Sequence, residues 1–240
     1  MFSNLKSLKM NNIFRFKKFS VKQDSLVFKV GTDGVLLGCL ANVLHAETIL
    51  DIGTGTGLLA LISAQKNPSA RIVAIDSEEA ACKLAQENIA SSPFASSISV
   101  IHSGLQTFSH PTKFDYIICN PPYFELSQQM HLKHLVARHQ LKLDYTSLLD
   151  KSSQLISDHG MTGYIFPYED EEHILSAAQT FNLFPKTIVR ISGIKNGKIR
   201  RTFLELTRQE QEVTFRSLYV EESPRIWSEE YSLLTQDFYL

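Results

Sequence analysis

Apolar runs and helical patterns alternate along the chain from residue 48 onward, and this alternation limits the folds that it can adopt. The apolar runs are rich in β-branched residues, and the segments between them have apolar residues three or four positions apart. Strands that alternate with helices form βαβ units and a mostly parallel sheet, so the chain is expected to be an α/β protein. Strands are expected at residues 48–51, 71–76, 97–102, 114–120, 161–167, 187–191 and 198–207, and helices at 58–65, 78–90, 145–157 and 169–181.

The last two expected strands depart from a parallel arrangement. Gly193 and the pair Asn196-Gly197 leave too short a connection for a crossover helix, so these strands are expected to form an antiparallel hairpin. A seven-stranded, mostly parallel sheet with an antiparallel C-terminal hairpin and helices on both faces resembles the Rossmann-like fold of class I methyltransferases. A dinucleotide-binding domain, by contrast, usually has parallel strands throughout.

Composition and length indicate one soluble domain. The 240 residues are 43% hydrophobic and 20% charged, and no apolar run reaches the ~18 residues that a membrane span requires. We expect a single domain with a basic N-terminal extension (1–45), a catalytic core (46–207) and a C-terminal tail packed on the core (208–240). The N-terminus has no secretory signal pattern, so the expected location is cytoplasmic.

Charge and cysteine usage narrow the expected partners. The formal net charge is −1, but residues 1–30 hold seven basic side chains against the single acidic Asp24. Attraction to an anionic polymer would therefore be concentrated in patches, although a solvated start of the chain explains these charges equally well. The cysteines, Cys39, Cys82 and Cys119, form no C-x-x-C pair, so neither a zinc knuckle nor a disulfide framework is indicated.

A glycine-rich turn, Asp51-Ile52-Gly53-Thr54-Gly55-Thr56-Gly57, follows the first strand of this series. Its glycines allow a tight turn with the backbone close to a ligand. The dinucleotide fingerprint G-x-G-x-x-G requires glycine at position 58, where Leu58 stands, so the segment disfavours NAD. The D-x-G-x-G-x-G form resembles the first motif of S-adenosylmethionine enzymes. This resemblance implies cofactor contacts at Asp51, Gly53 and Gly55.

Two later strand ends complete the expected cofactor site. Asp76 closes the second strand, where a carboxylate can accept hydrogen bonds from both ribose hydroxyls, and capping of the next helix is the alternative. Enzymes of this type often have an acidic residue after the third strand that recognises adenine, but Gly104 stands there. Ser103 and the backbone of Gly104 are the expected substitutes.

The fourth strand ends in Asn120-Pro121-Pro122-Tyr123, at the sheet edge where the glycine turn is also expected. An amino group on a purine is a poor nucleophile because its lone pair is delocalised into the ring. The Asn120 side-chain oxygen and the Pro121 carbonyl can each accept one N–H and stabilise the charge that builds on nitrogen. Tyr123 and Phe124 offer rings on which a flat base can stack. A Pro-Pro turn that only ends a strand is the alternative.

The N-P-P-Y segment indicates a planar amino nitrogen but does not select the substrate, since adenine N6, guanine N2 and protein glutamine N5 methyltransferases share it. Other segments resemble the bacterial tRNA(Val) adenine N6-methyltransferase family. They are the K-V-G-T-D-G stretch at 29–34, the aromatic and basic run at 14–19, and residues 58–61, 120–124, 137–138, 147–149 and 227–240. The resemblance implies S-adenosylmethionine as methyl donor and adenine 37 of tRNA(Val), beside the anticodon, as acceptor.

The resemblance also implies roles for further residues. Thr32 and Asp33 would cover the methionine end of the cofactor, where Asp33 can pair with the ammonium group. The alternative for Asp33 is an N-cap of a helix at 34–44. The residues expected to contact nucleic acid are Lys17, Lys18, Phe124, Arg138, Arg200 and Arg201, of which Arg138 falls in a basic segment at 125–143. Arg200 and Arg201 begin the last strand, and capping of a hairpin is the alternative for them.

Histidines within this basic segment raise the question of a metal. His131, His134 and His139 have helical metal-ligand spacing, but the chemistry needs no metal and no acidic or thiol partner adjoins them. We therefore expect no metal, and the sequence indicates no obligate protein partner.

Two other classes of function stay open on the sequence alone. Another RNA or DNA amino-methyltransferase, acting on rRNA guanine N2 or DNA adenine N6, would share the glycine turn and Asn120. A non-catalytic nucleic-acid-binding module with a vestigial cofactor pocket would have little need of both Asp76 and Asn120 in register.

Overall fold

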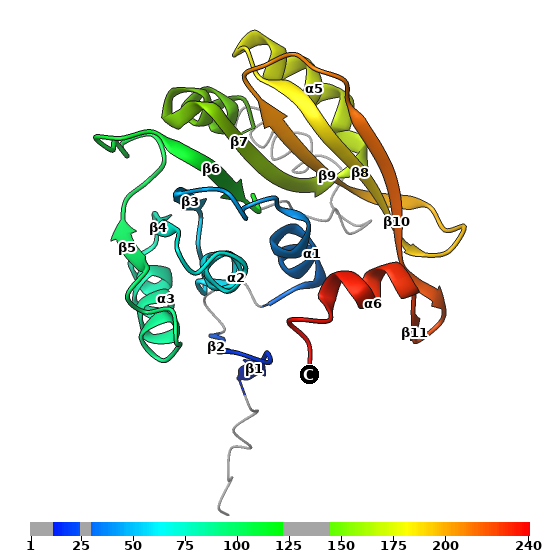
Figure 1. The fold of residues 1–240 in the computed structure, drawn as a ribbon, viewed down its shortest axis with the longest axis horizontal. Coiled ribbons are helices and arrows are strands. Elements are labelled where there is room, and N and C mark those ends of the chain that lie inside the picture. The colour runs from blue at the N-terminus through cyan, green and yellow to red at the C-terminus, as the bar shows by residue number, and fades with distance from the viewer. Residues whose placement is uncertain (1–11, 25–29, 122–144) are drawn as a thin grey trace, which may run out of the picture.

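The fold is given by a computed structural model that describes residues 12–24, 30–121 and 145–240. Near the N-terminus, β1 (Ile13–Arg15) and β2 (Ser20–Lys22) form a two-stranded hairpin. The other strands are β3 (Thr48–Ile52), β4 (Arg71–Asp76), β5 (Ile98–His102), β6 (Phe114–Cys119), β7 (Ile156–Pro167), β8 (Phe184–Ile194), β9 (Ile199–Thr207), β10 (Thr214–Ser223) and β11 (Ile226–Trp227). They form one nine-stranded sheet in the order β11-β10-β8-β9-β7-β6-β3-β4-β5 (Figure 1).

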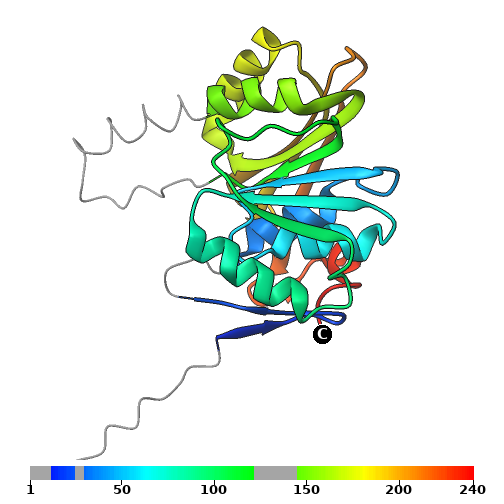
Figure 2. The same cartoon turned by 90° about the vertical axis from the view of Figure 1, so that its left-hand side faces the viewer.

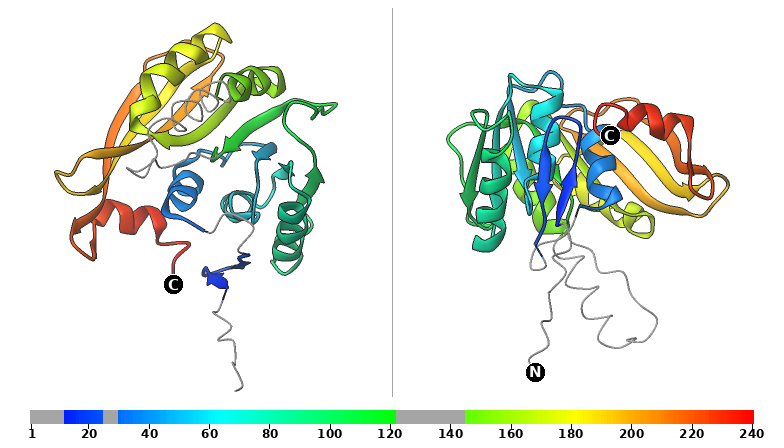
Figure 3. Two further views of the ribbon diagram at one scale, coloured as in Figure 1. Left: turned by 180° about the vertical axis from the view of Figure 1, so that it is seen from behind. Right: turned by 90° about the horizontal axis from the view of Figure 1, so that it is seen from below.

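Helices cover both faces of this sheet. They are α1 (Thr32–Leu40), α2 (Leu58–Lys66), α3 (Glu79–Ala90), the 3-10 turn η1 (Tyr168–Asp170), α5 (Glu171–Thr180), α6 (Glu229–Thr235) and a helical segment at 145–155. Figures 1 and 3 show α1, α2, α3 and α6 on one side and α5 with residues 145–155 on the other. Because neighbouring residues of a strand point to opposite faces, Ile49 packs in the core under α1 and α2, and Leu50 packs in the core under α5.

The seven predicted strands correspond to β3 through β9, and the predicted hairpin is the antiparallel pair β8 and β9. β9 also pairs antiparallel with β7, so it is inserted between β7 and β8. The segment expected to be a tail contributes two further strands, and β10 pairs parallel with β8. These strands were not predicted because β10 lies near the edge, where residues 214–217 are exposed and only Leu218 and Val220 are buried.

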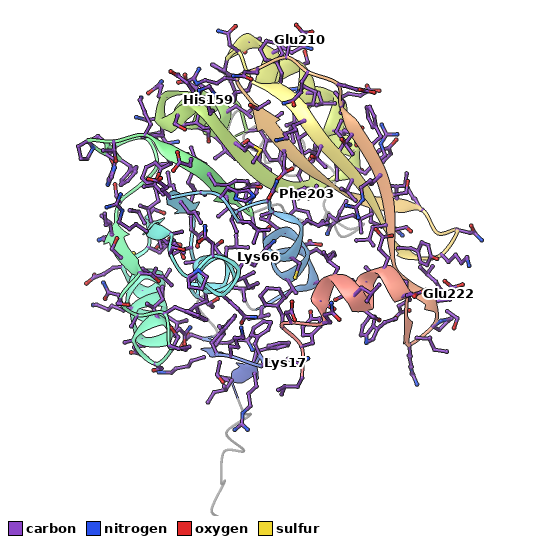
Figure 4. All side chains as sticks on the ribbon, in the orientation of Figure 1. Lys17, Lys66, His159, Phe203, Glu210 and Glu222 are labelled. Carbon is purple, nitrogen blue, oxygen red and sulfur yellow. The ribbon has the colours of Figure 1, made fainter. Side chains whose placement is uncertain are left out.

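A lysine from α2 determines where α1 ends. Its Nζ donates hydrogen bonds to the carbonyl oxygens of Gly38 (3.1 Å), Cys39 (2.6 Å) and Ala41 (2.6 Å). Carbonyls at the end of a helix have no partner within the helix, and a cation there also faces the negative end of the helix dipole. The residue is Lys66, labelled between α1 and α2 in Figure 4, and burial lowers the pKa of its ammonium group. The helix expected at 34–44 therefore stops at Leu40.

The β1–β2 hairpin packs against the C-terminal residues, as Figure 2 shows. The backbone N–H of Lys17 donates to Phe238 (2.8 Å), and the Lys17 ammonium donates to the carbonyl of Gln236 (2.5 Å). The ring of Phe16 is stacked on that of Tyr239, with centroids 6.0 Å apart. The two ends of the described chain thus support each other. None of the helices in the described segments is long and apolar enough to cross a membrane.

Candidate active site

The residues predicted to form the site gather at one edge of the sheet. β3, β4, β5 and β6 are mutually parallel, so their carboxyl ends share that edge, which is where ligands bind in open α/β sheets. The glycine turn follows β3, Asp76 ends β4, Ser103 and Gly104 follow β5, and Asn120 follows β6. Motifs that are separated in the sequence therefore lie next to one another along this edge of the sheet.

The glycine turn requires its glycines. Gly53, Gly55 and Gly57 have φ values of 69°, 55° and 83°, a region in which other residues are strained. Asp51 stabilises the turn through two hydrogen bonds: its Oδ2 accepts one from Thr54 Oγ1 (2.6 Å) and one from the backbone N–H of Ala60 (3.2 Å). This carboxyl is fully buried, and burial raises its pKa to about 7. The visible role of Asp51 is to hold the turn against α2.

Asp76 joins the glycine turn to the next helix. Its Oδ2 accepts the backbone N–H of Gly55 (2.9 Å), and its Oδ1 accepts the backbone N–H of Glu78 (3.0 Å), the N-cap residue of α3. The helix capping weighed as an alternative is not seen, because the N-cap residue Glu78 receives no side-chain cap and Asp76 bonds only the N–H of Glu78 itself. The ribose contact stays a prediction. Ser103 donates its backbone N–H to the Asp76 carbonyl (2.9 Å), which brings the end of β5 next to the same point.

Asn120 presents an unpaired acceptor. Its Oδ1 is buried and has no hydrogen-bond partner in the described part of the chain. A buried polar atom without a partner costs about 1–3 kcal/mol, so such atoms in native proteins call for an explanation, such as a ligand. The first turn of α1 lies close by: a Cβ on Gly34 would be 3.9 Å from Asn120 Nδ2 and 3.0 Å from Leu58 Cδ2. Pro121, the second predicted acceptor, is buried.

Asp33 and Arg201 were predicted for different ligands, and the structure pairs them with each other. Arg201 Nε donates to Asp33 Oδ2 at 2.9 Å, and the two side chains are 16% and 23% exposed. The N-cap interpretation of Asp33 is wrong, because the N-cap residue is Gly31 and Asp33 lies within the first turn of α1. Thr32 begins that helix and is exposed.

The residues predicted to contact nucleic acid are distributed over several elements. Lys17 is bonded to the C-terminal segment, while Lys18 and Arg200 are exposed. Three further residues predicted for the site lie outside the described residues: Tyr123, Phe124 and Arg138. The same holds for the histidines weighed as metal ligands, His131, His134 and His139. Within residues 12–24, 30–121 and 145–240, no group of three or more His, Cys, Asp or Glu side chains could hold a metal ion.

The sequence reasoning missed one residue that touches the glycine turn. Asn88 of α3 is 3% exposed, and its Nδ2 donates to the carbonyls of Thr56 (2.8 Å) and Lys22 (3.0 Å). Its Oδ1 accepts the backbone N–H of Lys22 (2.8 Å). One amide thus ties β2 of the hairpin to the glycine turn. The available signal was a polar residue at a buried position of an amphipathic helix.

Solved structures share this fold. A predicted O-methyltransferase from Agrobacterium tumefaciens matches with a TM-score of 0.67 at 17% identity, covering 86% of this chain and 96% of its own. A ribosomal protein L11 methylase from Lactobacillus delbrueckii subsp. bulgaricus has a TM-score of 0.55 at 18% identity, with 77% and 82% covered. At these identities the likeness shows the fold alone. Fold and edge residues together define a Rossmann-like methyltransferase.

Sequence relatives narrow this class. The family model described as the methyltransferase small domain matches residues 27–146. A tRNA1(Val) (adenine(37)-N6)-methyltransferase from Flavobacteriaceae bacterium (strain 3519-10) is 39% identical over 94% of this chain and 97% of its own length. A protein of the same name from Bacteroides thetaiotaomicron is 38% identical, with 96% and 98% covered. The chain belongs to the tRNA1(Val) (adenine(37)-N6)-methyltransferase family.

Proposed function

We propose that the chain transfers a methyl group from S-adenosylmethionine to N6 of adenine 37 in tRNA(Val), beside the anticodon. The observation that carries the reaction type is the buried Oδ1 of Asn120 at the carboxyl edge of the sheet, which has no hydrogen-bond partner among the residues that the structure describes. It suits an amino group that must be held through its N–H bonds. The names of relatives that match over nearly their full length support the choice of adenine and of tRNA(Val).

The residues at the edge fit the methyl donor. A Cβ on Gly53 would meet no described atom within 4 Å, so the backbone of the turn faces open space. Gly53 and Gly55 would lie under the amino-acid end of S-adenosylmethionine and Asp76 at its ribose, and Asp33 would pair with its ammonium group. When bound, the cofactor supplies an electrophilic methyl group. The other residues proposed for this site are Thr32, Asp51, Ser103 and Gly104.

Asn120 and Pro121 would act on the target base. Each offers one oxygen, the Asn120 amide and the Pro121 carbonyl, to an N–H of the adenine amino group. Two acceptors hold this nitrogen in one orientation and stabilise the positive charge that develops on it, so no base has to remove a proton beforehand. Tyr123 and Phe124 would stack on the base. Adenine 37 lies in a single-stranded loop, so turning it out costs less than from a duplex.

Basic residues would hold the RNA. Lys17, Lys18, Arg138 and Arg200 are proposed to contact phosphates, which makes binding dependent on salt concentration. Such contacts position the RNA and carry no base specificity.

The direct test is methylation in vitro. Purified protein is incubated with S-adenosylmethionine and an unmodified tRNA(Val) transcript, and the digested RNA is analysed by nucleoside mass spectrometry. We expect N6-methyladenosine from this transcript and none from a transcript with guanosine at position 37. Product formed only on ribosomal RNA as N2-methylguanosine, or only on DNA as N6-methyldeoxyadenosine, would reject the proposed substrate. Absence of any product on all of these nucleic acids would favour the non-catalytic binding module.

A further inference from the structure

The ion pair between Arg201 and Asp33 links the centre of the sheet to the active-site edge. Arg201 lies on β9 and is paired on both sides, with Pro167 of β7 and with Ile191 of β8. Its backbone is therefore held within the sheet. From this position its Nε reaches Asp33 Oδ2 at 2.9 Å, with 16% and 23% of the two side chains exposed.

The partner of Arg201 belongs to the helix turn that packs on the candidate catalytic asparagine. Asp33 is adjacent to Gly34, whose Cβ position is 3.9 Å from Asn120 Nδ2. The hydrogen bond from Arg201 ends on Oδ2 of Asp33, and the Asp33 side chain is 23% exposed, so a ligand can approach this carboxylate. A carboxylate held by a guanidinium on one oxygen has a defined orientation for a cation on the other.

We propose that Arg201 is a positioning residue of the cofactor site, which orients Asp33 toward the ammonium group of S-adenosylmethionine. The inference rests on the proposed function, and it changes the role expected for Arg201 from the sequence. The Arg201 side chain is only 16% exposed and is paired with a carboxylate at 2.9 Å on α1, which makes it poorly placed to contact phosphate. The phosphate role is better suited to Arg200, the adjacent residue, whose side chain is exposed.

Two ligands separate this role from general support of the fold. S-adenosylmethionine carries the ammonium group, and 5′-methylthioadenosine lacks the amino-acid part altogether. In calorimetric titrations of the purified protein, Arg201→Ala is expected to raise the Kd of S-adenosylmethionine about tenfold and to leave the Kd of 5′-methylthioadenosine unchanged. Arg201→Lys keeps the positive charge but places the hydrogen-bond donor differently. Its Kd for S-adenosylmethionine is therefore expected to lie between those of the wild type and Arg201→Ala.

Matched variants complete the test. Arg200→Ala removes the same charge from the neighbouring residue and is expected to weaken tRNA binding without changing the Kd of S-adenosylmethionine. In an Asp33→Ala background, a further Arg201→Ala is expected to change that Kd less than about twofold, because the two residues act through one contact.

Three results would overturn the inference. An equal rise in the Kd of both ligands in Arg201→Ala would show that Arg201 only supports the fold. Tighter binding of S-adenosylmethionine would show that Arg201 competes for Asp33 and does not orient it. Weaker tRNA binding with unchanged cofactor binding would return Arg201 to the phosphate role. Failure of the wild-type protein to bind S-adenosylmethionine would instead reject the proposed function, and the wild-type titration identifies that case first.

Discussion

At the carboxyl edge, two side-chain oxygens are buried and have no hydrogen-bond partner in the described part of the chain. They are Oδ1 of Asn120 and Oδ1 of Asp51. An amide oxygen cannot be protonated at neutral pH, so the Asn120 oxygen calls for a donor beyond the described residues, and the proposed target base would supply one through its amino group. A carboxyl group can instead take up a proton. Burial disfavours the charged form of the Asp51 carboxyl, and this raises its pKa to about 7. The same structural observation therefore leads to a catalytic prediction at one residue and to a stability prediction at the other.

Replacing Asn120 by alanine should separate catalysis from cofactor binding. Asn120→Ala removes a preorganised acceptor and is expected to lower turnover at least about 10²-fold, the scale measured when one such group is lost. The Kd of S-adenosylmethionine should stay within about twofold, because the role proposed for Asn120 is contact with the base and not with the methyl donor. Single-turnover kinetics and calorimetry measure the two quantities. Activity near the wild-type level would reject the role given to Asn120.

The pKa of Asp51 predicts how stability depends on pH. Its carboxyl titrates near 3.8 when unfolded and near 7 when folded, so between these values the folded state holds the extra proton and stability falls as pH rises. Asp51→Asn keeps the shape without the charge. Its unfolding free energy relative to wild type is expected to rise by about 2–4 kcal/mol from about pH 4 to about pH 7. Urea titrations across this range provide the measurement, and a difference that does not vary with pH would contradict the raised pKa.

At the scale of elements, α1 is held at both ends by side chains from other parts of the chain. Arg201 pairs with Asp33 in its first turn, and Lys66 caps its last carbonyls. Both contacts add to the packing of the buried residues between them, such as Leu36 and Leu37. Because a Cβ on Gly34 in the first turn of this helix would lie 3.9 Å from Asn120 Nδ2, the helix next to the candidate site is one that is fixed at both ends.

Lys66 is expected to be important for the stability of α1. Lys66→Met keeps the length and apolar character of the side chain but leaves the carbonyls of Gly38, Cys39 and Ala41 without their donor, so it should lower the unfolding free energy by about 1–3 kcal/mol. Lys83→Met is the control, since Lys83 forms only an exposed pair with Glu79 on α3 and its loss should cost less than about 0.5 kcal/mol. Equal effects of the two substitutions in urea unfolding would show that the cap contributes nothing.

The elements that the sequence predicted are those with local signals. The central strands contain continuous β-branched runs, and the β8–β9 hairpin follows from Asn196-Gly197, whose Asn196 has a φ of 58°. The β1–β2 hairpin and β10 lack such a signal, because their few aliphatic residues, such as Val21 and Leu218, stand singly among polar and aromatic ones and form no continuous run.

The same distinction applies to the site. Motif residues such as Gly53 and Asp76 could be placed at the edge from the strand order alone. Their hydrogen-bond partners could not, because the amide of Asn88 and the guanidinium of Arg201 reach residues far away in the sequence. A pattern along one chain carries no information on which distant side chain meets which carboxylate.

At the scale of the whole molecule, the hairpin and the C-terminal residues form a joint aromatic cluster. Tyr239 stacks on Phe16 at 6.0 Å and also lies 6.2 Å from Phe14, between ring centroids. Tyr239→Ala is expected to cost about 2–4 kcal/mol of stability and to speed amide exchange in residues 13–22, which lose their cover. Leu240→Ala, at a side chain 84% exposed, is the control and should change neither quantity. Unchanged exchange of the hairpin in Tyr239→Ala would show that the cluster does not hold it.

The hydrogen bond from Lys17 to Gln236 also has a consequence in time. Its partners are 219 residues apart, so a growing chain that adds ~5–20 residues per second makes them about 10–40 seconds apart. Until residues 236–239 have emerged from the ribosome, the β1–β2 hairpin lacks its hydrogen bonds to Gln236 and Phe238 and its ring contact with Tyr239, and it has only its contacts with α3, such as those of Asn88. The nascent chain should therefore complete the packing of this hairpin only after residue 239 has been added, when the strands of the central sheet have already been made.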